Sequence, residues 1–430
     1  MAAIRPFKAI RYNQAMLGNP AAVLARPYDV INPEEQEVLY QKNPYNIIRL
    51  EYGKTYPGDH QTDNRYSRAS KTIKQWLNEG VLQCDEIENF YFYEQTFIYN
   101  GQEYTRRGVM AALKIEPYSS KVVLPHEKTM AAPKKDRLEL LSHSRANFSP
   151  VFTLIPDPQQ RIDCFFEKVT GKIPLLETTE ESGQKHRLWA ANDPALINDL
   201  QDYLADQPLL IADGHHRYET ALTYLQSIDP SQLPGARYIL TTLVSVYDPG
   251  LLRLPTHRLL NKLNHHQTKI IEQKINEHFE VIEWGDPDHF ESQAYLAELD
   301  KVSREKSGFG YITADKICLL TPKSAGKSGK TASGIALPVK LLHEQILNPL
   351  AAADKNRDSD KNLLGFSHDF AGSLDSVKSG SADAVFILGT IPVARVLDQA
   401  RQGAVLPQKS TYFYPKLPSG LLIYHMDLSY

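Results

Sequence analysis

The residues with the clearest chemical potential lie in the segment Leu209–Leu225, which reads LLIADGHHRYETALTYL. An apolar, strand-like run ends at the turn Asp213-Gly214, and a helical pattern begins directly after it. The start of a helix presents unpaired backbone N–H groups and the positive end of the helix dipole, and a glycine before it lets the backbone approach a ligand closely. Three side-chain donors follow at once, and they are His215, His216 and Arg217. The segment therefore predicts a site for a phosphate or carboxylate, which an arginine can bind with two parallel hydrogen bonds.

A simpler interpretation of the same segment is a capped helix after a buried strand, with Asp213 near the cap and the histidines in solvent. Apolar residues at helical spacing would form the buried face of that helix. Three consecutive donors serve no purpose in packing, however, and this favours the anion site.

A second group of candidates follows the strand-like run Lys121–Leu124 in the sequence PHEKT. Glu127 could act as a general base, and His126 or Lys128 could contact phosphate. The alternative is an ordinary charged loop between a strand and a helix.

Three further residues are candidates for contact with a substrate. Asp29 follows Pro27-Tyr28 and could supply a second carboxylate for metal or base work, or it could cap the helix expected near Pro33. His257 and Arg258 could close over a substrate, although Arg258 could equally form a surface ion pair.

The sequence gives little support for two other kinds of site, a phosphate-binding P-loop and a histidine-based metal site. The sequences Gly326-Lys327-Ser328 and Gly329-Lys330-Thr331 lack the glycine that a phosphate-binding P-loop needs five positions earlier, because Thr321 and Ser324 stand there. No HxxxH or HExxH spacing occurs, so the ligands of any metal remain unknown.

The elements that must position these residues alternate between strand and helix. Phe90–Tyr99, Asn100-Gly101 and Glu103–Arg107 predict a hairpin, since Asn-Gly suits a type I′ turn. Helical spacing marks Arg65–Leu77 and Pro194–Leu204, and Pro208–Ala212 is typical of a buried strand. This alternation predicts an α/β or α+β class, with segments expected at 1–155, 156–265 and 266–430.

Composition excludes several classes of protein. The chain has 430 residues, of which 42% are hydrophobic and 23% charged, so a folded protein is expected. The net charge of −3 gives no basic excess for duplex binding, and no apolar stretch is long enough for a membrane helix. Charged residues near the N-terminus argue against a signal peptide. We therefore expect a cytoplasmic protein that binds neither membrane nor specific DNA, with three scattered cysteines and no disulfide framework.

Seven segments resemble the domain-of-unknown-function family 1015, and they span nearly the whole chain. They are Pro27–Ile31, Asn43–Leu50, Pro125–Thr129, Ala146–Phe152, Ala212–Ala221, Leu254–Arg258 and Lys409–Leu417. The segment ADGHHRYETA also resembles the helix-start motif of the ParB/sulfiredoxin-like superfamily, which implies a mixed core at 156–265 elaborated by N- and C-terminal segments.

Within that superfamily the likeness is greatest to free-serine kinases, which also show Asp-Gly-His-His-Arg. Sulfiredoxins carry a reactive cysteine where this chain has His215, so sulfinic acid repair is not expected. ParB proteins have Glu-Arg in place of His215-His216 and a basic DNA-binding domain that we do not find. The kinase resemblance implies Asp213 near the chemistry, Gly214–Arg217 on phosphate, and ADP or ATP with Mg²⁺ as cofactors.

Together these inferences lead to a small-molecule phosphotransferase that acts on a hydroxylated metabolite, with Asp213 or Glu127 accepting the hydroxyl proton. A non-catalytic sensor of nucleotides or phosphometabolites is the alternative, and a metal-dependent phosphatase or hydrolase is the third hypothesis. The partner is a small-molecule substrate, and the sequence leaves a homo-oligomer open.

Overall fold

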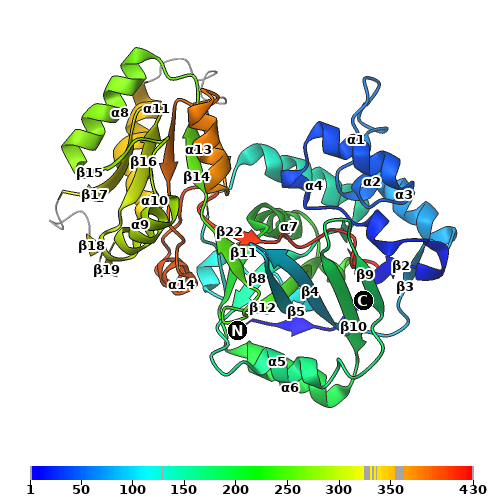
Figure 1. Ribbon diagram of the computed structural model, residues 1–430. Coiled ribbons are helices and arrows are strands. Elements are labelled where there is room, and N and C mark those ends of the chain that lie inside the picture. The colour runs from blue at the N-terminus through cyan, green and yellow to red at the C-terminus, as the bar shows by residue number, and fades with distance from the viewer. Residues whose placement is uncertain are drawn as a thin grey trace. The chain divides into compact units, whose positions relative to one another are not determined.

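The computed structural model describes residues 2–127, 129–323, 330–331, 334–335, 337–353 and 363–428. Strands and helices alternate along the chain, which confirms the predicted mixed α/β class (Figure 1). Lys128 and most of the Gly326–Thr331 segment lie outside the described residues. Among the residues that the structure describes, no helix is long and apolar enough to cross a membrane.

The chain folds into two compact units. The first unit comprises Met1–Pro125, Thr129–Leu252 and Pro415–Tyr430, and the second comprises His126–Lys128 and Arg253–Tyr414. This division differs from the three consecutive segments expected from the sequence. The boundary expected near residue 155 falls within one sheet, because strands from both sides of it pair with each other.

A nine-stranded mixed sheet forms the centre of the first unit. Its order is β6 (Val123–Leu124), β11 (Leu209–Asp213), β8 (Val151–Ile155), β12 (Tyr238–Ser245), β5 (Gln102–Lys114), β4 (Phe90–Tyr99), β10 (Lys185–Ala191) and β9 (Leu176–Thr179), with β1 (Ile4–Arg5) paired to β5. β11 is parallel to β6 and antiparallel to β8, while β8 is parallel to β12.

The predicted hairpin is confirmed as β4 and β5, which pair in register from Tyr91–Met110 to Tyr99–Gln102. Asn100 and Gly101 both adopt positive φ, 49° and 77°, as a type I′ turn requires. The hairpin strands continue well into the core, since most of β4 is buried.

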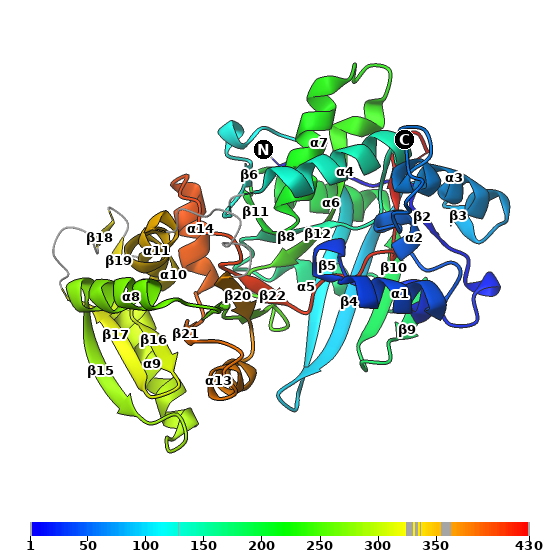
Figure 2. The same ribbon diagram turned by 90° about the horizontal axis from the view of Figure 1, so that it is seen from above.

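Helices cover both faces of this sheet. Those of the first unit are α1 (Pro33–Lys42), α2 (Ile48–Glu51), α3 (Arg65–Asn78), α4 (Ala131–Ser144), α5 (Arg161–Glu167), α6 (Pro194–Ala205) and α7 (His215–Ser227). In Figure 1, α5 and α6 run along one side of the sheet and α7 lies on the other. Figure 2 shows α4 beside α7. The predicted helices at Arg65–Leu77 and Pro194–Leu204 are confirmed as α3 and α6.

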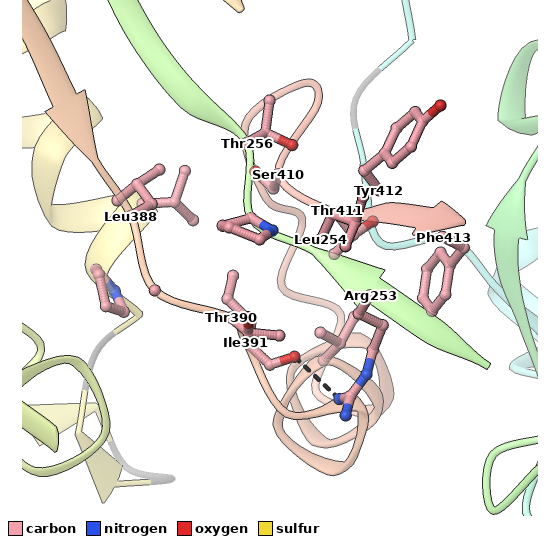
Figure 3. A pocket seen from close by; sticks show the side chains of 15 residues that line it. Arg253, Leu254, Thr256, Leu388, Thr390, Ile391, Ser410, Thr411, Tyr412 and Phe413 are labelled. Atoms are coloured by element: carbon pink, nitrogen blue, oxygen red, sulfur yellow. Dashed lines mark hydrogen bonds between the residues drawn. The ribbon is translucent and has the colours of Figure 1, made fainter. Parts of the chain in front are cut away.

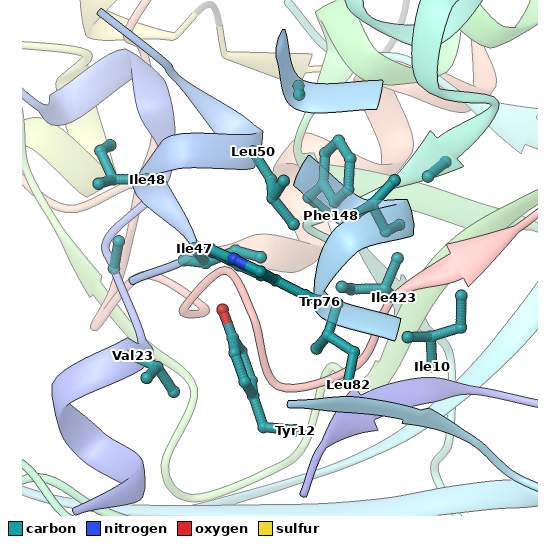
Figure 4. Close-up of a cluster of buried hydrophobic side chains, with 14 of the residues drawn as sticks. Ile10, Tyr12, Val23, Ile47, Ile48, Leu50, Trp76, Leu82, Phe148 and Ile423 are labelled. Atoms are coloured by element: carbon teal, nitrogen blue, oxygen red, sulfur yellow. The ribbon is translucent and has the colours of Figure 1, made fainter. Parts of the chain in front are cut away.

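A separate apolar cluster joins the N-terminal segments to the end of the chain (Figure 4). Tyr12 from β2 (Ile10–Tyr12), Trp76 from α3 and Ile423 are among its buried members. β2 pairs with β3 (Leu82–Cys84), and β7 (Ala146–Asn147) pairs with β23 (Tyr424–His425). The last residues of the chain are therefore part of the first unit's core.

The second unit is built on a six-stranded sheet. Its order is β15 (Phe279–Gly285), β17 (Ile317–Pro322), β16 (Phe309–Thr313), β21 (Ala384–Ile387), β14 (His257–Leu260) and β20 (Leu364–Ser367). One face packs on α9 (Ser292–Lys306) and α13 (Phe370–Lys378) through a shared apolar cluster. Within the described residues, the other helices of this unit are α8 (His265–His278), α10 (Pro338–Leu342), the π-helix His343–Leu347, α11 (Asn348–Ala353) and α14 (Val393–Arg401). Two further strand pairs lie in the described residues: β13 (Leu252–Leu254) pairs with β22 (Tyr412–Tyr414), and β18 (Lys330–Thr331) pairs with β19 (Gly334–Ile335).

Candidate functional site

The strand, turn and helix predicted around Asp213 are confirmed as β11, Gly214 and α7. Gly214 has φ +91°, a conformation that side chains rarely adopt, and a Cβ there would lie 2.9 Å from the Arg217 guanidinium. Both facts require glycine. The N-cap residue of α7 is Gly214, which has no side chain to cap the first turn, and the start of a helix is a place where backbone N–H groups can bind an anion.

Two cations hold the carboxylate of Asp213. Arg217 Nη2 lies 2.6 Å from one oxygen, and Lys416 Nζ forms an ion pair with the other. Burial alone would raise the pKa of Asp213, but the charges of Lys416 and Arg217 outweigh it and hold the pKa well below its usual range. Asp213 is therefore ionised at neutral pH, and its carboxylate holds the side chains of Arg217 and Lys416 in place.

Arg217 is also tied to the backbone of a neighbouring segment. Its Nη1 donates to the Ser149 hydroxyl at 3.0 Å and to the Pro150 carbonyl at 2.6 Å. Its buried Nε has no hydrogen-bond partner among the described residues. The guanidinium therefore fixes the position of the turn and also places a positive charge beside it.

The network continues from Ser149 into a buried ion pair. The Ser149 hydroxyl donates to Glu51 at 3.0 Å, and Arg137 Nη1 lies 3.2 Å from the same carboxylate oxygen. The Arg137 guanidinium also lies 3.9 Å from the centre of the Tyr28 ring. Arg217, Ser149, Glu51 and Arg137 all line a hollow of about 370 Å³ in the first unit.

The two histidines of the turn differ in exposure and partners. His215 is buried, which contradicts the alternative of solvated histidines for this residue. His216 Nε2 accepts a hydrogen bond from the backbone N–H of Met130 at 3.0 Å. Burial, as the largest influence, lowers the pKa of His216, so it is neutral at pH 7 and presents Nδ1–H as a donor.

Asp29 lies near this turn, on the 3₁₀ turn Tyr28–Val30. Its charge acts on both His216 and Arg217. Its side chain is exposed and makes no hydrogen bond or ion pair with any residue of the described ranges. The helix at Pro33 is capped by Asn32 instead, whose side chain accepts from the Glu35 N–H, so the alternative that Asp29 caps it is wrong.

His126 and Glu127 belong to the second unit. The Glu127 carboxylate accepts the backbone N–H groups of Lys409, Ser410 and Thr411, at 2.9 Å for Ser410. His126 is fully buried, with Nε2 2.7 Å from the Thr411 hydroxyl. In this arrangement both side chains hold the Lys409–Thr411 loop.

His257 and Arg258 lie on β14 of the same unit, and both are buried. Burial lowers the pKa of His257 to about 4, and its Nδ1 accepts from the Leu388 N–H at 3.2 Å. The Arg258 guanidinium donates to the carbonyls of Thr256, Gln408 and Lys409. The alternative of a surface ion pair for Arg258 is wrong, because the strand register turns this side chain inward.

The structure thus brings together, in the first unit, the candidates Asp29, Asp213 and the turn Gly214–Arg217. Four residues of this site were missed from the sequence: Lys416, Ser149, Glu51 and Arg137. Three of them lie in, or directly after, segments that carry the family resemblance, namely Lys409–Leu417, Ala146–Phe152 and Asn43–Leu50. Their position in or beside these segments could therefore have indicated them from the sequence.

For metals, the described residues contain no group of three or more His, Cys, Asp or Glu side chains placed to share an ion.

A comparison with protein families identifies the chain. The model of a family described as "Protein of unknown function (DUF1015)" matches residues 4–345. The chain belongs to the DUF1015 family. A search of curated proteins found no match.

Several solved structures are similar to this DUF1015 chain at a distance. A conserved hypothetical protein from Pyrococcus furiosus has 16% identity and a TM-score of 0.39, covering 75% of this chain and 97% of that one. A free serine kinase in complex with AMP has 14% identity and a TM-score of 0.37, covering 73% and 92%. SbnI with a C-terminal truncation, from Staphylococcus aureus, has 8% identity and a TM-score of 0.38, covering 73% and 87%.

Proposed function

We propose that the first unit binds the phosphates of a nucleotide at the turn Gly214–Arg217 and transfers a phosphoryl group to a hydroxylated small metabolite. The observation that carries the proposal is the start of α7, whose N-cap is a left-handed glycine directly after β11 and brings no capping side chain of its own. Backbone N–H groups in this geometry favour a phosphate.

The charges around the turn support the same ligand. Lys416 and Arg217 share the single charge of Asp213, which leaves one positive charge in excess within that group of three. His216 adds a neutral donor. Since phosphoryl transfer depends mainly on positioning and on compensation of phosphate charge, such a cluster can supply both.

The contacts of the three candidate carboxylates favour Asp29 as the proton acceptor. Both oxygens of Asp213 are engaged by cations, and Glu127 is engaged by backbone N–H groups of the second unit. Asp29 is exposed and near His216 and Arg217. This revises the expectation that Asp213 or Glu127 takes the proton.

In the proposed step the substrate hydroxyl gives its proton to Asp29 and its oxygen bonds to the terminal phosphorus. The bond from that phosphorus to the bridging oxygen breaks, and the nucleotide leaves with one phosphate fewer and with the electron pair. Mg²⁺ bound to the phosphates would neutralise their charge, and Asp29 is the carboxylate of this site that could join its coordination shell.

The first test is binding of ADP and ATP with Mg²⁺, read as thermal stabilisation of the protein. Ligand at about 100 times its Kd should stabilise the fold by about 2.7 kcal/mol. Lys416→Met should weaken binding at least about tenfold, because an ion pair near the phosphates is lost. Lys168→Met, at an exposed pair with Asp199, is the matched control. Absence of any nucleotide effect on the wild-type protein would refute the proposal.

The second test is turnover, followed as a phosphorylated product by mass spectrometry with serine and other hydroxylated metabolites. Asp29→Asn should bind nucleotide normally in the absence of Mg²⁺ but lower the rate by about 10²- to 10⁴-fold. Binding without turnover in the wild-type protein would instead support the nucleotide sensor. Equal rates in the wild-type protein and Asp29→Asn would show that Asp29 does not accept the proton of the substrate hydroxyl.

A further inference from the structure

Lys416 reaches Asp213 from a part of the chain that has just left the second unit. It follows β22, whose Tyr412 and Phe413 are drawn beside β13 in Figure 3. The chain enters the first unit again at Pro415. Because a side chain extends from its own backbone, the position of the Lys416 ammonium depends on how the first unit holds the backbone on either side of this residue.

Two buried polar side chains bind the carbonyl groups that flank the Cα atom of Lys416. Arg106 Nη2 donates to the Pro415 carbonyl at 2.7 Å, and Gln95 Nε2 donates to the Lys416 carbonyl at 3.5 Å. Gln95 and Arg106 are directly opposite each other on β4 and β5, and the Gln95 amide oxygen also accepts a hydrogen bond from Arg106. This pair therefore holds both peptide groups next to Lys416 from one point of the central sheet.

The Arg106 guanidinium is closed off from solvent. The residue is 1% exposed, and its Cζ lies 4.9 Å from the centre of the Phe152 ring. Phe152 is the strand partner of Asp213. Burial lowers the pKa of Arg106 to about 10, so the side chain is still charged at neutral pH. A buried charge is costly unless hydrogen bonds satisfy it, and one of these bonds goes to the backbone next to Lys416.

We propose that Arg106 is a positioning residue of the phosphate site, which acts through Lys416 and does not itself touch the nucleotide. With Gln95 it fixes the backbone from which the Lys416 side chain extends, so that the ammonium stays at Asp213. This role rests on the proposed function, because the phosphates bound at the turn are what Lys416 would compensate. Without the bond from Arg106, the ammonium can move away from the turn, and its attraction for phosphate falls with distance.

The first experiment measures the position of Lys416 without any nucleotide. The full-length protein is acetylated briefly with acetic anhydride, and the rate at each lysine is followed by peptide mass spectrometry. The Lys416 side chain is 11% exposed and paired with Asp213, so it should react slowly in the wild-type protein. Arg106→Met should raise that rate about tenfold, the effect of losing one hydrogen bond from a charged group. Lys42, a partly buried lysine paired with Glu181, is the internal reference whose rate should stay the same.

Arg68→Met is the matched control variant. Arg68 also donates to a backbone carbonyl of the first unit, that of Lys54, and it pairs with Asp59. Its loss should leave the acetylation rate of Lys416 unchanged. Thermal unfolding checks that each variant is folded. Should Arg106→Met fail to fold, Arg106→Lys keeps the charge without the planar fork of donors, and it should still raise the Lys416 rate above that of the control.

The second experiment is a double-mutant cycle on the binding of ADP. Arg106→Met should weaken binding about tenfold in the presence of Lys416. In the Lys416→Met background the same change should weaken it by less than about twofold, because the lysine through which Arg106 acts is gone. A general loss of packing would weaken binding equally in both backgrounds.

Two results would overturn the positioning role of Arg106. One is an unchanged acetylation rate of Lys416 in the folded Arg106 variant, and the other is equal weakening of ADP binding in both backgrounds. Failure of the proposed function is a different result. If the wild-type protein bound neither ADP nor ATP while acetylation rose as expected, Arg106 would still position Lys416 and only the assigned ligand would be wrong.

Discussion

At the scale of single residues, the first unit's site depends on ion pairs that are nearly closed to solvent. Arg217 makes hydrogen bonds to Ser149, Pro150 and Asp213, so it holds the turn together before any ligand arrives. Arg217→Ala should therefore reduce stability as well as binding. We expect a loss of about 3 kcal/mol in urea unfolding, because removing one partner of a buried pair leaves the others poorly compensated.

The control for this prediction is Arg145→Ala. Arg145 pairs with Asp427 at 3.3 Å, but both side chains are about half exposed. Exposed pairs contribute about 0–1 kcal/mol. If the two variants lost the same small amount of stability, Arg217 would be a ligand-binding residue only and the buried network would have little structural role.

At the scale of elements, the turn that follows β12 contains a carboxyl group with an unusual pKa. Asp248 accepts N–H groups from Arg107 at 3.0 Å and Gly250 at 2.8 Å. Burial outweighs these bonds and raises the pKa of Asp248 to about 6. Between about pH 4, its value in the unfolded chain, and pH 6, the folded state holds the proton that the unfolded state has lost. Asp248 therefore destabilises the fold progressively as the pH rises through that window.

Asp248→Asn removes this titration. It keeps an acceptor oxygen for one of the two N–H groups and turns an NH2 toward the other, which is a loss of stability that does not depend on pH. The stability of the variant minus that of the wild type should grow by about 1 kcal/mol from pH 4 to pH 7, a value reduced for the partial exposure of the side chain. Taking the difference cancels the histidines, such as His257, that titrate in the same range. Asp199→Asn, at an exposed pair, should show no such trend, and a flat difference for Asp248→Asn would contradict the raised pKa.

At the scale of the whole molecule, neither unit is a continuous stretch of chain. The first unit takes its last part from Pro415–Tyr430, which supplies Lys416 to the site, β23 to a two-stranded sheet and several fully buried side chains, among them Leu422 and Ile423. A chain truncated after Tyr414 should therefore lose the first unit's packing.

Limited proteolysis mapped by mass spectrometry can measure this loss. Cleavage of the truncated chain should concentrate in Met1–Pro125 and Thr129–Leu252, and removal of several large buried side chains should cost more than a domain's usual stability of about 5–15 kcal/mol. Leu428→Ser alters a residue of the same tail whose side chain reaches the surface, and it should leave the cleavage pattern unchanged. Full resistance of the truncated chain would show that the tail is dispensable.

The sequence by itself determined the local structure of the site. An apolar run before Asp213, a glycine that alone suits φ +91°, and apolar spacing after His215 were enough to predict β11, the turn and α7, because all three depend on neighbouring residues. The Asn100-Gly101 hairpin followed from the same kind of local rule.

Only the tertiary structure decided which distant residues share a site. Lys416 reaches Asp213 across 203 positions, and Ser149 and Glu51 join through packing that no local spacing encodes. Conversely, Glu127 and His257 have residue types suited to catalysis, yet their polar atoms bind backbone N–H groups of the second unit. A side chain's chemical role depends on whether its hydrogen-bonding capacity is already used within the fold, and this is settled only when remote segments pack together.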